Sequence, residues 1–255
     1  MCKKVYYDYN VFLRWKEGKN ADLVLASSQC RCKGYQLLYS PAHVEEIACI
    51  ARDTKGERDA DKFVNEHLNA LSCFSKKLEI VPDPTSEKGV SFIEENPQKC
   101  WEDRVIPGYC MNYFFEEMNR IYKKQLSKNL IGKNQYKNIL SELKIQKYIC
   151  KNFAEIGYNV EDLSNINVQE NRDYCLKFIP AMFKTLKEIG FKREGENKTR
   201  SEILDECHAI YAAQCDIFIT EDKRLREKVK IIFRFLNIKT IILSISEWIE
   251  YMKKI

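Results

Sequence analysis

The sequence has no C-x-x-C pair and only three histidines, although it contains 11 cysteines. The two closest cysteines, Cys30 and Cys32, have neither a second pair nor a histidine nearby. Structural zinc sites are usually built from two such pairs, or from one pair and two histidines. The spacing therefore argues against a zinc centre.

Long apolar runs are also missing, since no stretch approaches the roughly 18 apolar residues of a membrane-spanning helix. The opening stretch, MCKKVYYDYNVFLRW, carries Asp8 and Asn10 among its apolar residues, which is not typical of a signal peptide. A cysteine-rich chain without an export signal predicts a cytoplasmic protein whose thiols stay reduced. We therefore expect no membrane partner.

What the sequence does contain is typical of a globular protein. Its 255 residues are 45% hydrophobic and 31% charged, which allows one large α/β domain or a small domain with an insertion. The net charge of +5, from 42 basic minus 37 acidic residues, permits nucleic acid as a partner without requiring it.

The apolar pattern predicts strands that alternate with helices near both ends of the chain. We expect strands at 4–7, 35–40, 216–219 and 239–244, and an extended piece at 78–83. We expect helices at 41–52, 59–74, 199–214, 223–236 and 246–255, a long loop at 84–110, and three or four helices between 112 and 190. Apolar strands alternating with helices predict a mainly parallel sheet with helices on both faces, a three-layer α/β/α fold.

Four acidic residues are expected near the carboxyl ends of these strands, where sites form in open parallel sheets. Asp8 directly follows the first strand, and Asp222 comes shortly after the strand at 216–219. Glu46 lies in the helix after the second strand, and Asp205 lies in the helix before the third. Clustered carboxylates stay ionised only when a cation offsets them, and Mg²⁺ prefers such oxygen ligands.

Each acid also has an ordinary interpretation when it is considered alone. Asp222 can be a helix cap, Asp205 a solvated helix residue and Glu46 a first-turn acid that favours the helix dipole. His208 is more typical of a packed or solvated histidine than of a catalytic one. The joint pattern of the acids, rather than any single member, favours a metal site that hydrolyses phosphodiester bonds.

Three segments, VYYDYNVF (5–12), YSPAHVEEI (39–47) and DECHAIYAAQCDIFITEDKRL (205–225), resemble the motifs of PIN-domain nucleases. The resemblance covers about 4–52 and 199–250. It implies an α/β/α fold and a Mg²⁺- or Mn²⁺-dependent nuclease that acts most often on RNA. The residues that it implies are four metal-binding catalytic acids, Asp8, Glu46, Asp205 and Asp222, with Asn10 and Thr220 as supporting hydrogen-bonding groups. It selects Glu46 over Glu45, and Asp216 is either an additional acid or only the start of a strand.

The chain departs from small PIN domains in the separation between the second and third acids. From Glu46 to Asp205 is 159 positions. We therefore expect one PIN-like domain over 1–255, with its core at about 1–58 and 196–255 and a mainly helical insertion at 59–195. The insertion is a candidate substrate clamp, partner-binding surface or oligomer interface.

A row of lysines in the insertion is the candidate nucleic-acid surface. Between Met118 and Asn152 there are nine basic residues and one acidic residue. At about 100° per residue, five lysines fall on one side of a helix, namely Lys133, Lys137, Lys144, Lys147 and Lys151. The alternative is an ordinary solvated surface. An acidic site repels RNA, so we expect a basic surface of this kind to hold the substrate.

The sequence thus predicts a metal-dependent endoribonuclease, with three alternatives. A nuclease acting on structured or single-stranded DNA fits the same chemistry, and a non-catalytic RNA- or protein-binding PIN module fits the same fold. A haloacid-dehalogenase-like phosphatase is disfavoured, because its chemistry needs an Asp two residues after the first, where this chain has Asn10. The setting, whether toxin, RNA processing or defence, stays open, as do an inhibitory or targeting protein partner and a homo-oligomer.

Overall fold

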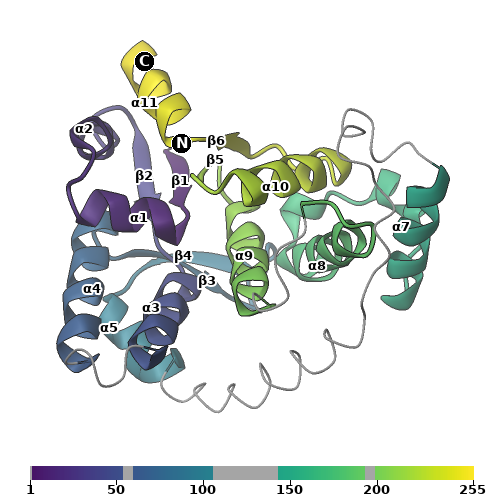
Figure 1. The fold of residues 1–255 in the computed structure, drawn as a ribbon, viewed down its shortest axis with the longest axis horizontal. Coiled ribbons are helices and arrows are strands. Elements are labelled where there is room, and N and C mark those ends of the chain that lie inside the picture. Colours follow the sequence, from purple (N-terminus) through teal and green to yellow (C-terminus); the bar gives the residue numbers. More distant parts are fainter. Residues whose placement is uncertain (1, 54–59, 106–142, 193–198) are drawn as a thin grey trace.

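The structure is a computed structural model that describes residues 2–53, 60–105, 143–192 and 199–255 (Figure 1). Its centre is a four-stranded parallel sheet in the order β2-β1-β5-β6. The strands are β1 (Lys3–Tyr7), β2 (Tyr35–Leu38), β5 (Ile217–Ile219) and β6 (Ile241–Leu243). Strands β2, β5 and β6 lie within their predicted ranges, β1 begins one residue earlier than predicted, and the predicted parallel pairing is confirmed.

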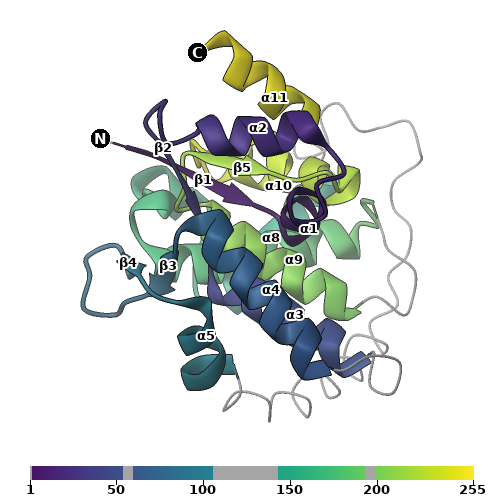
Figure 2. The ribbon, with the colours of Figure 1, turned by 90° about the vertical axis from the view of Figure 1, so that its left-hand side faces the viewer.

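Helices cover both faces of this sheet, as predicted. The described helices are α1 (Tyr9–Lys16), α2 (Ala21–Gln29), α3 (Pro41–Asp53), α4 (Ala60–Ser75), α5 (Pro97–Cys100), α7 (Leu143–Glu155), α8 (Arg172–Glu188), α9 (Thr199–Ala212), α10 (Lys223–Phe235) and α11 (Ile245–Lys254), with a π-helical turn η1 (Trp101–Val105) and 3₁₀ turns η4 (Val160–Asn165) and η5 (Val168–Glu170). Figure 2 shows α2 and α11 along one side of the strands. None of the described helices is both long and apolar enough to cross a membrane.

Two hydrophobic cores flank the sheet, because successive side chains of a strand point to opposite faces. Tyr6 packs with Phe218 in one core, which is completed by residues of α7, α8, α9 and α10. Tyr7 packs with Ile217 in the other, which is completed by residues of α1, α2, α3, α4 and α11. Helices α4, α7 and α8 come from the segment 59–195, so this segment shares both cores with the rest of the chain.

The predicted long loop at 84–110 is wrong over its described part. Strand β4 (Val90–Glu94) pairs antiparallel with β3 (Leu78–Pro82). The turn between them ends at Gly89, whose φ of +68° favours glycine. Pro97 is the first residue of α5. The Asn96 side chain caps this helix by accepting a hydrogen bond from the backbone N–H of Gln98. The proline and glycine residues therefore mark a hairpin turn and a helix start.

The hairpin is a separate two-stranded sheet, and an isolated parallel bridge between Glu79 and Tyr39 joins it to the end of β2. The backbone N–H of Ile80 donates to the Tyr39 carbonyl oxygen at 2.8 Å, and the N–H of Tyr39 donates to the Leu78 carbonyl oxygen at 3.1 Å. Further along the chain, the predicted break near Gly157 is confirmed by the end of α7, and 164–171 lies mostly in 3₁₀ turns. The predicted break near Gly132 lies outside the described residues.

Candidate active site

The first predicted acid, Asp8, lies at the carboxyl edge of the sheet, directly after β1. Its backbone N–H donates to the Ile219 carbonyl oxygen at 2.8 Å, which ties it to the end of β5. Its side chain is only 3% exposed, and its Oδ2 accepts a hydrogen bond from Thr220 Oγ1 at 2.9 Å. Asp8 occupies the N-cap position of α1, yet its carboxylate makes no capping hydrogen bond. A side chain suited to capping is therefore turned towards the tip of β5 instead.

Asp222 follows the tip of the same strand and caps α10. Its Oδ1 accepts hydrogen bonds from the backbone N–H groups of Arg224 at 2.6 Å and Leu225 at 3.0 Å. Its own backbone N–H lies 3.2 Å from Thr220 Oγ1, so Thr220 contacts both acids. The ordinary interpretation of Asp222 as a cap is thus correct, and it leaves Oδ2 without a hydrogen-bond partner among the described residues.

Glu46 reaches the same place from α3 and is bound there by a histidine of α9. His208 is 1% exposed, and its Nε2 lies 2.9 Å from Glu46 Oε2. Burial alone lowers the pKa of His208, but the hydrogen bond to Glu46 and the charges of Glu46 and Asp8 raise it above its ordinary value. His208 is therefore packed, as one interpretation held, and its protonated form is favoured by the carboxylates around it.

These side chains act on one another electrostatically, and we call Asp8, Glu46, Asp222 and His208 the acidic rim. Burial raises the pKa of Asp8 to about 6, His208 and the Thr220 hydrogen bond oppose the shift, and Glu46 and Asp222 add to it. Glu46 and Asp222 are thus each close enough to Asp8 for their charges to repel its carboxylate. A single imidazolium offsets only part of their charge.

A buried polar network behind the rim positions His208. Tyr6 Oη lies 2.8 Å from His208 Nδ1, 2.6 Å from Ser40 Oγ and 3.3 Å from His43 Nδ1. His43 Nε2 lies 2.9 Å from the Tyr7 carbonyl oxygen and must donate to it, so Nδ1 is the accepting nitrogen. Burial and the nearby His208 hold the pKa of His43 well below its ordinary value, which keeps this ring neutral.

Sequence analysis did not identify Tyr6, Ser40 or His43 as site residues. A signal was present, because a serine and a histidine occur at the start of the helix that follows a strand. Their partner His208 is 202 positions from Tyr6, however, and no local pattern predicts that contact.

The other predicted site residues differ in where they lie relative to the acidic rim. Asp205 is half-buried on α9, three residues before His208, and such residues are neighbours on a helix surface. Asn10 is exposed on α1, and no side-chain hydrogen bond to the rim is found for it among the described residues. Asp216 lies at the opposite end of β5, where its Oδ2 accepts a hydrogen bond from the Lys4 backbone N–H at 2.7 Å. Asp216 therefore marks the start of the strand and does not join the rim.

The carboxylate oxygens of the acidic rim are the type of ligand that a hard cation prefers. Asp8 Oδ1, Glu46 Oε1 and Asp222 Oδ2 have no hydrogen-bond partner among the described residues, and carboxylate oxygens are ligands that Mg²⁺ prefers. In the part of the chain that the structure describes, no group of three or more His, Cys, Asp or Glu side chains is close enough to hold an ion. One ion bound by all three carboxylates would therefore require their side chains to rotate.

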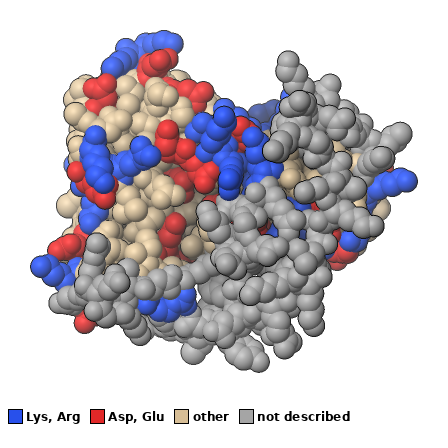
Figure 3. Space-filling model, in the orientation of Figure 1, with Lys and Arg blue, Asp and Glu red and all other residues tan. Residues whose placement is uncertain are grey.

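A basic surface begins directly at the rim, on α10. Lys223, Lys230 and Arg234 are exposed, and with Arg226 they fall within about 80° of one another around the helix. Arg226 Nη1 also donates to the Thr220 carbonyl oxygen at 2.9 Å. Figure 3 shows Lys and Arg side chains gathered next to acidic ones over this part of the molecule. Cations are thus placed immediately beside the acids.

The predicted lysine row stays a prediction. Lys133 and Lys137 lie outside the described residues, as does the side chain of Lys144. Lys147 and Lys151 are exposed on α7. Lys151 Nζ lies 3.3 Å from Glu188 Oε1, so this lysine is paired with an acid of α8.

Known proteins give no family for this chain. No protein-family model matches it, and neither a curated protein nor a solved structure matches it. The resemblance to PIN-domain nucleases therefore depends on the motif residues at 5–12, 39–47 and 205–225 and on the positions that they occupy in the fold.

Proposed function

We propose that this protein is a metal-dependent nuclease of the PIN type that hydrolyses RNA phosphodiester bonds at the acidic rim. The observation that carries the proposal is that Asp8 and Asp222 both contact Thr220 at the carboxyl edge of a parallel sheet, with the charge of Glu46, from a third element, acting on Asp8. Ligand sites of open parallel sheets form at this edge. Asp205 is the fourth proposed acid, one helical turn before His208.

The three carboxylates would hold a Mg²⁺ or Mn²⁺ ion through the oxygens that no described donor occupies. When bound, such an ion supplies an activated water and offsets charge on the phosphate that is attacked. Thr220 keeps Asp8 in position through its 2.9 Å hydrogen bond. His208 keeps Glu46 at the rim through its Nε2 and is itself held by Tyr6.

The substrate needs a basic surface, because a cluster of carboxylates repels a phosphate backbone. The α10 surface, formed by Lys223, Arg226, Lys230 and Arg234, begins one residue after Asp222 and supplies this attraction. Such contacts are made to phosphates and so are shared by RNA and DNA. RNA is proposed over DNA because of the PIN resemblance, and the two are separated by experiment.

The test is a cleavage assay with the full chain on one labelled single-stranded sequence, made once as RNA and once as DNA. Each is incubated with Mn²⁺, with Mg²⁺ and with EDTA. We expect RNA products with either metal and none with EDTA. Cleavage of DNA alone would transfer the proposal to a DNA nuclease. Full cleavage in EDTA, or none under any condition with folded protein, would overturn the metal-dependent nuclease and favour a non-catalytic binding module.

A further inference from the structure

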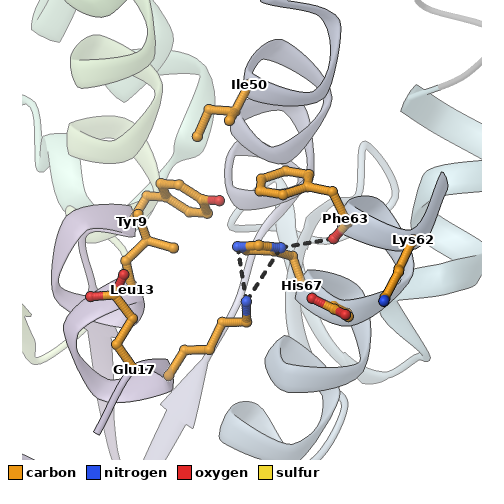
Figure 4. Close-up of a pocket in the computed structure, with 9 residues that line it drawn as sticks. Tyr9, Leu13, Glu17, Ile50, Lys62, Phe63 and His67 are labelled. Carbon is orange, nitrogen blue, oxygen red and sulfur yellow. Dashed lines mark hydrogen bonds between the residues drawn. The ribbon is translucent and has the colours of Figure 1, made fainter. Parts of the chain in front are cut away.

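A cavity of about 610 Å³ opens between α1, α3 and α4. Its walls include Tyr9, Leu13 and Lys16 of α1, Ile50 of α3, and Phe63 and His67 of α4 (Figure 4). Its volume lies in the range of small-molecule sites, which are mostly apolar with a few convergent polar groups. None of these residues belongs to the acidic rim.

Two residues of the cavity nevertheless lie close to residues of the acidic rim along the chain. Tyr9 directly follows Asp8, and Ile50 lies four residues after Glu46, on the same side of α3. Burial raises the pKa of Tyr9, and the charge of Glu46 raises it further. A molecule in the cavity would therefore be next to any group bound at the rim.

Among the polar groups of the cavity, the Tyr9 hydroxyl gives the clearest indication of a bound ligand. Tyr9 is 1% exposed, and its Oη is buried without a hydrogen-bond partner in the described part of the chain. Buried hydroxyl groups are nearly always paired, because an unpaired one costs stability. Figure 4 shows this hydroxyl directed into the space between Ile50 and Phe63. A ligand with a hydrogen-bonding edge would pair with it there.

Helix α4 contributes two rings to the cavity, and the Lys16 ammonium of α1 contacts one of them. His67 Nδ1 lies 2.8 Å from the Phe63 carbonyl oxygen and must donate to it, and Nε2 accepts from the Lys16 ammonium at 3.1 Å. The Phe63 and His67 rings lie against each other, with centroids 3.9 Å apart. An ammonium has three donors, so Lys16 can bind an anion while it contacts His67.

The acids that also line the cavity form no ion pair with Lys16 in the described part of the chain. Glu17 is exposed, and its Oε2 lies 2.8 Å from Lys19 Nζ, so it is paired at the mouth. Glu66 is likewise exposed, as is Lys62. Lys16 is half-buried, and its ammonium contacts His67. The interior of the cavity therefore favours a flat ring together with a negative charge.

We propose that this cavity is a nucleotide subsite that holds the residue next to the scissile phosphate of a single-stranded substrate. The base would lie against Tyr9 and Phe63, and the next phosphate would bind Lys16. Lys16 comes seven residues after Tyr9, or about 10 Å along the helix, which leaves room for one nucleotide. The base must be unpaired to enter, which selects single strands. Its role as a substrate subsite rests on the proposed nuclease function, whereas nucleotide binding itself does not.

The experiment measures binding of adenosine 5′-monophosphate to the full chain in EDTA by calorimetry, so that metal chemistry plays no part. Lys16→Gln and Phe63→Leu are each expected to weaken binding by about tenfold, from the loss of a phosphate contact and of ring stacking. Arg14→Gln, an exposed cation of α1 that does not line the cavity, is the matched control and should bind as the wild type does. Tyr9→Phe removes only the unpaired hydroxyl, so it should fold and bind a few-fold more weakly.

The outcomes separate this proposal from the nuclease function. No saturable binding by the wild type, or wild-type binding by Lys16→Gln, Phe63→Leu and Tyr9→Phe with unchanged melting temperatures, would overturn the subsite. Binding that depends on Lys16 and Phe63 without any cleavage of RNA or DNA would support a nucleotide site and reject the nuclease. Metal-dependent cleavage with an unchanged KM in all three variants would keep the nuclease and reject the subsite. Comparing the 2′-deoxy monophosphate shows whether the sugar is read.

Discussion

Two carboxylate clusters in this protein differ in the groups that compensate their negative charge. At the junction of the sheet and the hairpin, Glu79 is fully buried, and both of its oxygens accept from Arg104 Nη2, at 2.9 and 2.8 Å. Tyr39 Oη donates to it at 2.9 Å, and Arg104 also pairs with Glu95. At the acidic rim, Asp8 is equally buried but has one hydroxyl donor and two acidic neighbours.

The comparison is informative because burial raises both pKa values to about 6. In the Arg104 cluster (Tyr39, Glu79, Glu95, Arg104), a guanidinium opposes that shift, so the cluster joins β3 and η1 to the end of β2 as a structural element. The acidic rim has no Arg or Lys among the groups that oppose the Asp8 shift most, only His208 and Thr220. A carboxylate cluster whose negative charge is only partly compensated is suited to bind a cation.

The largest expected effect is on catalysis at the rim. Asp8→Asn keeps the shape and the Thr220 contact but removes one ligand charge. We expect cleavage of RNA with Mn²⁺ to fall at least about 1,000-fold, or roughly 4 kcal/mol of transition-state stabilisation. Because the variant also relieves repulsion, its melting temperature should not fall. Residual activity within tenfold of the wild type would place the metal elsewhere.

The reciprocal change breaks the structural cluster. Arg104→Met leaves Glu79 buried without its cation, so we expect the free energy of unfolding to fall by about 3–5 kcal/mol in urea denaturation. Adding Glu79→Gln to the same chain should recover part of the loss, because the unpaired charge is then gone. A loss under about 1 kcal/mol for Arg104→Met would mean that the two clusters do not differ as argued.

The adjacent acids Glu45 and Glu46 allow a test of which residues belong to the acidic rim. Glu46 makes a hydrogen bond to His208, whereas Glu45 acts on His208 only through its charge. We expect Glu46→Gln to reduce cleavage by about 10–100-fold through a weakened metal site. Glu45→Gln, the matched control, should stay within about twofold of the wild type. If Glu45→Gln were the inactive variant, the second motif would be displaced by one residue.

The smallest expected effect is a pH dependence of stability from the Arg104 cluster. The pKa of Glu79 is raised to about 6 in the folded protein, first by burial, and is about 4.3 in the unfolded chain. The folded state therefore binds the proton more tightly, so this group favours folding at low pH and loses about 2 kcal/mol as pH rises from about 4 to 6. Glu79→Gln should flatten that part of the stability curve. An unchanged slope in the variant would assign the pH dependence to other groups.

Much of the fold and part of the rim could be predicted from sequence. Apolar strands followed at once by polar residues located Asp8, Thr220 and Asp222, because strand ends are local features. The hairpin was missed because Pro84 and Gly89 mark turns and loops alike, and only pairing with β3 separates the two.

The rest depends on contacts between distant residues. His208 meets Glu46 across 162 positions, and Arg104 meets Glu79 across 25. Asp216 resembled a site acid in sequence, and only its hydrogen bond with the backbone of Lys4 assigns it to the other end of the strand. The cavity beside Tyr9 is formed by three helices, and no spacing within one of them reveals it.

The central claim is that the acidic rim binds a divalent cation, and titration of Mn²⁺ into metal-free protein tests it most directly. We predict saturable binding by the wild type and by Glu45→Gln, and at least tenfold weaker binding by Asp8→Asn. All three proteins should be compared at the same pH and ionic strength, with folding verified by melting temperature. No saturable binding by the folded wild type, or equal affinity in Asp8→Asn, would contradict the account.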